Sequence, residues 1–175
     1  ELLFGMVLYH AGGRQVMDGK SRWQEHVGKG VVSDKLTLFD QPHDRRFAGA
    51  TSFDGDGVPT KPTSIVDKGV LTLHLHDVYS ARRTKQKTTG HSGGPFALSV
   101  GKGKEALQSL HAARSSLLVV DRFSGNNDPI KGDFSGVAKA SRLFENGKDA
   151  GAVAETMIAG NFFEVAQAIL GVADH

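Results

Sequence analysis

Glycine is the residue that most constrains how this chain can fold. It occupies 22 of 175 positions, against about 12 expected at the ~7% usage of average proteins. Glycine accepts the backbone angles of tight turns and weakens helix interiors, so this density favours short strands joined by turns. We therefore expect an α+β fold of mostly antiparallel β-hairpins with a few short helices.

The first predicted hairpin joins residues 63–66 to residues 70–76 through a glycine-tipped turn. In the second of these strands, leucines alternate with polar residues, so His74 and His76 share the face opposite the core. Such an H-x-H pair can present two imidazoles to a metal, with a third ligand coming from elsewhere. His74 and His76 are therefore the candidate metal ligands of this chain, and a half-exposed polar strand face is the plainer interpretation.

The second predicted hairpin lies nearer the C-terminus. Residues 141–145 and 152–158 are joined through Asn146-Gly147, the dipeptide best suited to a two-residue type I′ turn. Residues 116–120 form a further predicted strand that is hydrophobic on both faces. Strands of that kind are normally covered on both sides. Because few helices are predicted to provide this cover, we expect a broad interface with another subunit.

Charge and cysteine content exclude several classes of protein. Lys and Arg number 21 and Asp and Glu 19, a net charge of +2 with the signs interspersed, so nucleic acid and membrane partners are not indicated. Cysteine is absent, which excludes disulfides, thiol nucleophiles and cysteine-containing zinc sites and fits a reducing, cytoplasmic location. The length predicts a single domain over residues 1–175, and the uncapped start without methionine suggests a piece of a longer protein.

A glycine-rich segment offers a second kind of chemistry. Residues 90–95 (GHSGGP) fit the G-x-S-x-G pattern of hydrolases, with Ser92 as the nucleophile. That motif needs an apolar strand before it and a helix after it, whereas residues 85–89 are polar and Pro95 follows closely. This context argues against Ser92 as a nucleophile. An independent hydrolase using Ser92 or a histidine-based metal is kept as an alternative. The basic run at residues 82–87 could contact phosphate or form a solvated loop.

Seven short segments carry more information in their order than any of them does alone. They are FDGDGVPT at 53–60, VDKGVL at 66–71, LHDVYSAR at 75–82, TTGH at 88–91, KGDFS at 131–135, FENG at 144–147 and MIAGN at 157–161. This ordered set resembles the C-terminal domain of the TldD/PmbA family, whose members are longer than this chain. The resemblance implies that residues 1–175 are the C-terminal part of such a protein.

The resemblance also implies a function. Family members are associated with zinc metallopeptidases of two related subunits. One subunit carries an H-E-x-x-x-H helix and a C-terminal cysteine, and the PmbA or TldE type lacks the metal ligands and shapes the peptide channel. This chain has neither feature, and its IAGN at residues 158–161 is closer to the PmbA/TldE type. We therefore expect a non-catalytic subunit without a cofactor of its own.

The same resemblance suggests the partners. They are a zinc-bearing TldD-like subunit in a heterodimer, or else a homo-oligomer, and an unfolded or modified peptide as the substrate. The family's older name, modulator of DNA gyrase, leaves a gyrase-associated module as another alternative. Family position and turn chemistry place two loops near the channel, although both could be plain structural turns. The candidate channel residues are Thr89, Gly90, His91, Ser92, Asp133, Phe134 and Ser135.

Two departures from the family pattern affect these residue assignments. His91 stands where the family usually has asparagine, and Asp56 stands where glutamate is usual.

Overall fold

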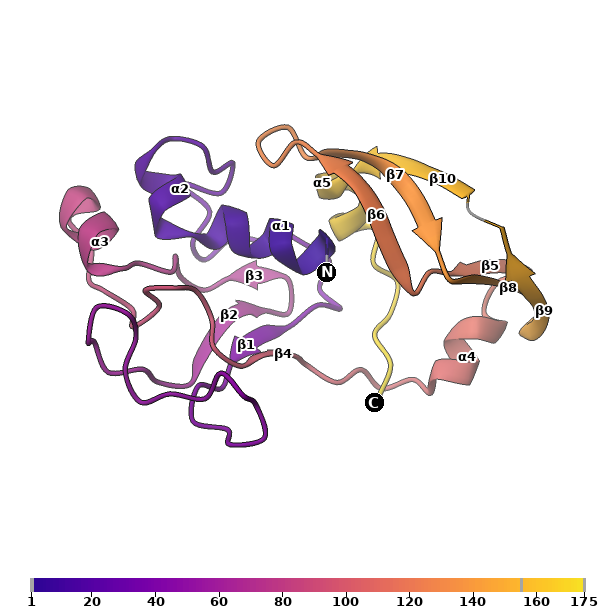
Figure 1. Ribbon diagram of the computed structural model, residues 1–175, viewed down its shortest axis with the longest axis horizontal. Coiled ribbons are helices and arrows are strands. Elements are labelled where there is room, and N and C mark those ends of the chain that lie inside the picture. Colours follow the sequence, from indigo (N-terminus) through magenta and orange to yellow (C-terminus); the bar gives the residue numbers. More distant parts are fainter. Residues whose placement is uncertain (1, 155, 175) are drawn as a thin grey trace. The chain divides into compact units, whose positions relative to one another are not determined.

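The computed structural model describes residues 2–154 and 156–174. The chain separates into two compact units (Figure 1). The N-terminal unit comprises residues 4–101, and the C-terminal unit comprises residues 102–174 together with residues 2–3. The expectation of a single domain stays a prediction, because compactness does not show whether either unit folds by itself.

The N-terminal unit is built on a four-stranded antiparallel sheet with the order β3-β2-β1-β4. Three short helices accompany the sheet, and the first of them begins in residues 2–3. In chain order the elements are α1 (Leu2–Ala11), α2 (Gly13–Met17), β1 (Leu38–Asp40), β2 (Thr63–Asp67), β3 (Val70–Leu71), α3 (Val78–Thr84) and β4 (Leu98–Val100).

The core of the N-terminal unit lies between this sheet and α1. Leu38 on β1, Ile65 on β2 and Leu71 on β3 are fully buried. From α1, Met6 and Val7 are buried as well. Most of the buried apolar side chains of the described chain belong to this unit, so it provides the firmer platform for a site.

The first predicted hairpin is confirmed at its turn and is wrong in the length of its second strand. Lys68 and Gly69 both have positive φ angles, +46° and +79°, as a two-residue type I′ turn requires. However, β3 ends at Leu71 instead of running to residue 76. Further along, the backbone N–H of Leu75 donates to the carbonyl of Ala11, the last residue of α1, at 2.8 Å.

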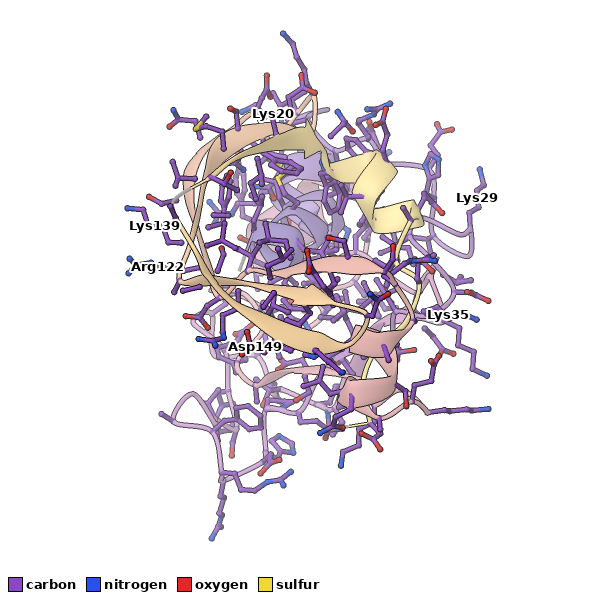
Figure 2. The ribbon with its side chains drawn as sticks, turned by 90° about the vertical axis from the view of Figure 1, so that its right-hand side faces the viewer. Lys20, Lys29, Lys35, Arg122, Lys139 and Asp149 are labelled. Carbon is purple, nitrogen blue, oxygen red and sulfur yellow. The ribbon has the colours of Figure 1, made fainter. Side chains whose placement is uncertain are left out.

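The C-terminal unit contains two three-stranded antiparallel sheets, with the orders β10-β7-β6 and β5-β8-β9. With the sheet of the N-terminal unit, they confirm the predicted α+β fold of antiparallel strands. The elements are α4 (Leu107–Ala112), β5 (Ser116–Val119), β6 (Arg122–Asn127), β7 (Asp133–Lys139), β8 (Ser141–Glu145), β9 (Lys148–Val153), β10 (Thr156–Asn161) and α5 (Phe162–Gln167). The register of β6 and β7 sets Arg122 opposite Lys139, and both side chains extend outward (Figure 2).

The second predicted hairpin is confirmed between β8 and β9, which Asn146-Gly147 joins with φ angles of +49° and +76°. The strand predicted over residues 152–158 is wrong, because it is two strands. β9 ends at Val153, and β10 begins at Thr156 and pairs with β7 in the other sheet.

The apolar strand predicted at residues 116–120 corresponds to β5. It lies at the edge of its sheet. Its side chains Leu117, Leu118 and Val119 are half-buried, and Val120, just beyond the strand, is exposed. Their cover by another subunit stays a prediction. Among the described residues, no helix is both long enough and apolar enough to cross a membrane.

Candidate functional site

A cleft of about 920 Å³ opens on the N-terminal unit. Its walls come from the end of α2, the loop that follows it, the extended segment after β3, and the segment after α3. It contains both candidate metal ligands and one candidate channel residue. The lining residues are Val16, Met17, Gln24, Glu25, Val27, Leu73, His74, His76, Thr84, Lys85, Gln86, Lys87 and Thr89.

The two histidines of the cleft are buried, so their interpretation as a half-exposed strand face is wrong. The exposed fraction is 9% for His74 and 4% for His76. His74 Nε2 lies 3.0 Å from the carbonyl oxygen of Trp23, and His76 Nδ1 lies 3.2 Å from Ser80 Oγ. Each imidazole therefore already has a hydrogen-bond partner within the protein.

Burial also decides the charge of these histidines. Desolvation lowers the pKa of His74, and neighbouring His26 lowers it further, against the carbonyl of Trp23. Desolvation likewise lowers the pKa of His76, and His74 adds to the effect, against the attraction of Asp77. Both groups are therefore neutral at neutral pH.

The donor set does not fit a zinc ion. Protein zinc sites use three or four side-chain ligands, and no three His, Asp or Glu side chains among residues 2–154 and 156–174 are grouped to hold a metal. Asp77, the nearest third candidate in the sequence, instead pairs with Arg14 at 2.5 Å and accepts from the backbone of Ser80 at 2.7 Å. We therefore assign no zinc-dependent step to this chain.

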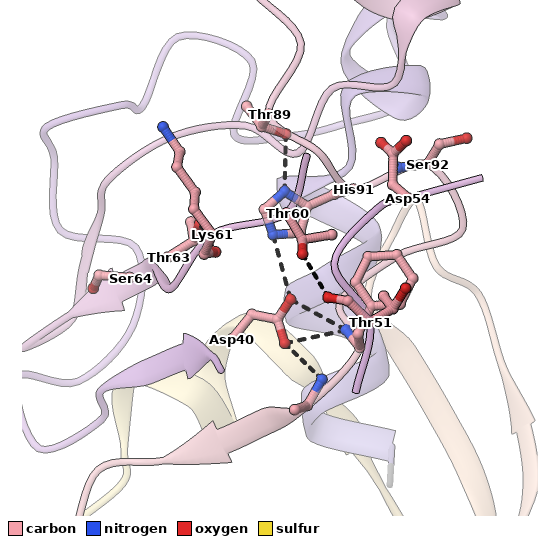
Figure 3. Close-up of polar contacts among 12 residues, drawn as sticks. Asp40, Thr51, Asp54, Thr60, Lys61, Thr63, Ser64, Thr89, His91 and Ser92 are labelled. Atoms are coloured by element: carbon pink, nitrogen blue, oxygen red, sulfur yellow. Dashed lines mark hydrogen bonds and ion pairs between the residues drawn. The ribbon is translucent and has the colours of Figure 1, made fainter. Parts of the chain in front are cut away.

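Thr89 attaches the glycine-rich loop to the wall of the cleft. Its backbone N–H donates to the carbonyl of His76 at 2.9 Å, and its Oγ1 accepts from the backbone N–H of His76 at 2.9 Å. The same hydroxyl lies 3.0 Å from His91 Nδ1 (Figure 3). Next in the chain, Gly90 has a φ of +76°, and a Cβ there would lie 2.7 Å from the carbonyl oxygen of Pro59. Glycine is thus required at position 90.

His91 lies in the protein interior beside Asp40. Its imidazole is 1% exposed, and His91 Nε2 lies 3.5 Å from Asp40 Oδ2, which is longer than a good hydrogen bond. Asp40 also accepts from the backbone N–H groups of Phe96 at 3.1 Å and Ala97 at 2.6 Å (Figure 3). Burial raises the pKa of Asp40, but His91 and these two donors outweigh it, so that this pKa is lowered. The pair therefore anchors the loop from inside.

Ser92 is held by its backbone. Its N–H donates to Asp54 Oδ2 at 2.9 Å, while Asp54 Oδ1 accepts from the N–H groups of Asp56 and Val58. Among the hydrogen bonds of the described residues, none joins Ser92 to an imidazole. Non-strand residues 85–89 precede it, and no helix follows the loop. Ser92 thus lacks both the base and the backbone context of a serine nucleophile.

The remaining candidate channel residues belong to the C-terminal unit. Asp133 Oδ1 accepts from Asn161 Nδ2 at 2.8 Å. The ring of Phe134 packs edge-on against Phe123, with 5.8 Å between the centroids. Ser135 pairs with Ala159 in the ladder between β7 and β10. These contacts hold the start of β7 in its sheet, and the channel role of the three residues stays a prediction.

The sequence patterns missed most of the cleft. The sequence did point to Lys85 and Lys87 as possible binding residues, since both lie in the basic run at residues 82–87. Nothing in the sequence pointed to Met17 and Val27, because single apolar residues in turn-rich segments resemble any other core residue. Their positions in the cleft follow only from the fold.

The fold and cleft define an α+β domain of antiparallel sheets with a groove in its N-terminal unit. The sequence profile of the PmbA/TldA metallopeptidase C-terminal domain matches residues 1–175. The chain therefore belongs to this family, which confirms the resemblance seen in its motifs.

One relative and two solved structures show how far this similarity extends. The metalloprotease PmbA of Escherichia coli O157:H7 is 32% identical over 173 residues, which cover 98% of this chain and 38% of that protein. The crystal structure of TldE from Thermococcus kodakarensis matches with a TM-score of 0.86 and 25% identity, covering 96% of this chain and 40% of that one. A Thermotoga maritima MSB8 protein, whose name associates it with DNA gyrase modulation, matches with a TM-score of 0.88 and 28% identity over 98% of this chain and 41% of that one. The chain thus spans about two fifths of the length of these relatives.

Proposed function

We propose that this domain belongs to a TldE/PmbA-type subunit of a cytoplasmic metallopeptidase complex. The subunit itself holds no zinc, and its cleft forms part of the channel that carries unfolded or modified peptides. A TldD-like partner in a heterodimer supplies the zinc, its ligands and the general-base glutamate. The cleft is the observation that carries this proposal, because in the part of the chain that the structure describes its two histidines are grouped with no third His, Asp or Glu ligand.

The backbone of the cleft wall supports a peptide as the ligand. Within the described chain, the peptide groups of Leu73 and His74 make no hydrogen bond to other backbone groups. An extended peptide can bind such groups by strand addition, which accepts many sequences because it uses main-chain atoms. The apolar side chains of Val16, Met17 and Val27 line the same cleft and offer contacts to the peptide's side chains.

The test compares the full-length protein that carries this domain alone and together with a TldD-like subunit. Cleavage of an unstructured peptide should require both chains, stop with a chelator, and stop when the glutamate of the partner's H-E-x-x-x-H motif is changed to glutamine. A stable monomer that cleaves peptides unaided would refute the proposal.

Metal analysis gives an independent check. The full-length protein purified without its partner should contain no stoichiometric zinc. One equivalent of zinc that disappears in His74→Ala or His76→Ala would show that this chain holds the metal itself.

A further inference from the structure

We propose that the cleft on the N-terminal unit selects peptides that carry an acidic side chain, which Lys85 and Lys87 bind. This inference rests on the proposed function, because it names the class of peptide that the same cleft accepts.

The first support is the charge of the cleft lining. Lys85 and Lys87 are exposed there, and Glu25 is the single acidic side chain in the lining. Within the part of the chain that the structure describes, neither lysine forms an ion pair with a carboxylate. These two cations are therefore available to a ligand. Arg82 and Arg83, exposed on the last turn of α3, add to the positive potential nearby.

The second support is the fixed position of Lys85. It follows α3 in a left-handed conformation, with a φ of +57° and a ψ of +34°. Its backbone N–H donates to the carbonyl of Arg82, and that of the next residue, Gln86, donates to the carbonyl of Ala81. The base of the Lys85 side chain is thus held at the cleft, so that less freedom is lost when its ammonium group binds a carboxylate.

The third support is the neutrality of the remaining ionisable groups. Burial lowers the pKa values of His74 and His76, so at neutral pH they add no charge to the wall. The facing groups are His26 and Asp77, which act on His74 and His76 respectively. The charge that a peptide meets in the cleft therefore comes mainly from the two lysines and Glu25.

The lining also favours a peptide over a nucleic acid, although both classes of ligand can be anionic. Proteins that bind single strands combine cations with aromatic side chains on which bases stack. The cleft has no aromatic ring in its lining other than the buried imidazoles. Its apolar residues are instead aliphatic, namely Val16, Met17, Val27 and Leu73. Such a surface suits the aliphatic side chains of a peptide that flank its acidic residue.

The experiment measures binding of two fluorescein-labelled peptides to the full-length protein by fluorescence anisotropy. The peptides are short, unstructured and identical except for one central glutamate, which is glutamine in the second. We expect the glutamate peptide to bind about two- to tenfold more tightly, the range for one or two exposed ion pairs. The difference should shrink as salt is added.

Two double variants locate the effect. Lys85→Gln with Lys87→Gln should remove the preference, so that the glutamate and glutamine peptides bind this variant with equal affinity. Lys61→Gln with Lys68→Gln is the matched control, because both lysines are exposed and lie outside the cleft lining. Lys68 also has a positive φ, of +46°, as Lys85 does. This control should keep the full preference.

The other outcomes separate this inference from the proposed function. Equal binding of the two peptides to the unaltered protein would overturn the inference and leave the proposed function standing. Failure to bind either peptide would overturn both. A single-stranded oligonucleotide that binds more tightly than the glutamate peptide, through Lys85 and Lys87, would replace the peptide with nucleic acid as the ligand.

Discussion

Replacing Asp40 tests whether the buried polar network holds the glycine-rich loop beside the cleft. Asp40 lies on β1 and is fully buried. It accepts hydrogen bonds from the backbone N–H groups of Phe96 and Ala97 and stands next to His91. No solvent can replace these interactions at a buried carboxylate, so their loss should appear directly in the free energy of unfolding.

The magnitude follows from the number of donors left without an acceptor. Each buried donor that loses its partner costs about 1–3 kcal/mol. Asp40→Ala leaves two backbone donors without an acceptor, so we expect the free energy of unfolding to fall by about 2–6 kcal/mol. Asp40→Asn keeps one acceptor oxygen and should cost about half as much. This ranking of the two variants is the core of the prediction.

Urea denaturation followed by circular dichroism would measure these changes. For a slope of about 2 kcal/mol per molar urea, Asp40→Ala should lower the midpoint by roughly 1–3 M. The control is Asp44→Asn, because Asp44 pairs only with exposed Arg46 and such pairs add little to stability. If Asp40→Ala unfolds at the same urea concentration as this control, the loop is not anchored by Asp40 and the reasoning fails.

Three further predictions follow from the same structure. Gly13→Ala should lower stability by about 1–3 kcal/mol, since a Cβ there would collide with the imidazole of His76. Gly5→Ala, with open space around it, should raise stability by about 0.5–1 kcal/mol. Equal melting temperatures of the two variants would contradict this prediction. Ser92→Ala should leave peptide cleavage by the complex within a few-fold, and labelling of Ser92 by a fluorophosphonate probe would contradict it. The pKa values of His74 and His76 are lowered in the folded state, so the unfolded chain takes up protons first as pH falls below about 6.5. The urea concentration at the unfolding midpoint should therefore decrease as the pH is lowered from about 7 to about 5. A midpoint that rises on acidification would be inconsistent with the burial of these histidines.

The turns of this fold could be predicted because their backbone angles are a local property. Asn146 and Gly147 both need positive φ, as do Lys68 and Gly69, and glycine adopts such angles without steric cost. The N-cap of α5 is equally local, since Asn161 accepts from the backbone N–H of Phe163 through its own side chain. In each case the residues that decide the conformation are neighbours in the sequence.

The strand ends could not be predicted, because partners distant in the sequence decide them. The sequence of residues 152–158 contains no turn residue and reads as one strand, yet β9 pairs with β8 whereas β10 pairs with β7. Likewise, the alternating pattern continues past Leu71, but the chain leaves the sheet there. Alternation indicates which side chains share a face, and it does not show where the neighbouring strand ends.

The histidine pair shows the same limit at the site itself. The residues that cover it come from elsewhere in the sequence: the carbonyl of Trp23 reaches His74 across 51 positions, and Gly13 packs against His76. A glycine pair after an apolar helix reads as a helix end, and nothing in the sequence shows that Gly13 must also leave room for an imidazole. That close approach buries the histidines, and burial lowers their pKa values. The three-dimensional fit therefore makes His74 and His76 part of the wall of a cleft, where no third His, Asp or Glu side chain of the described residues is grouped with them to hold a metal.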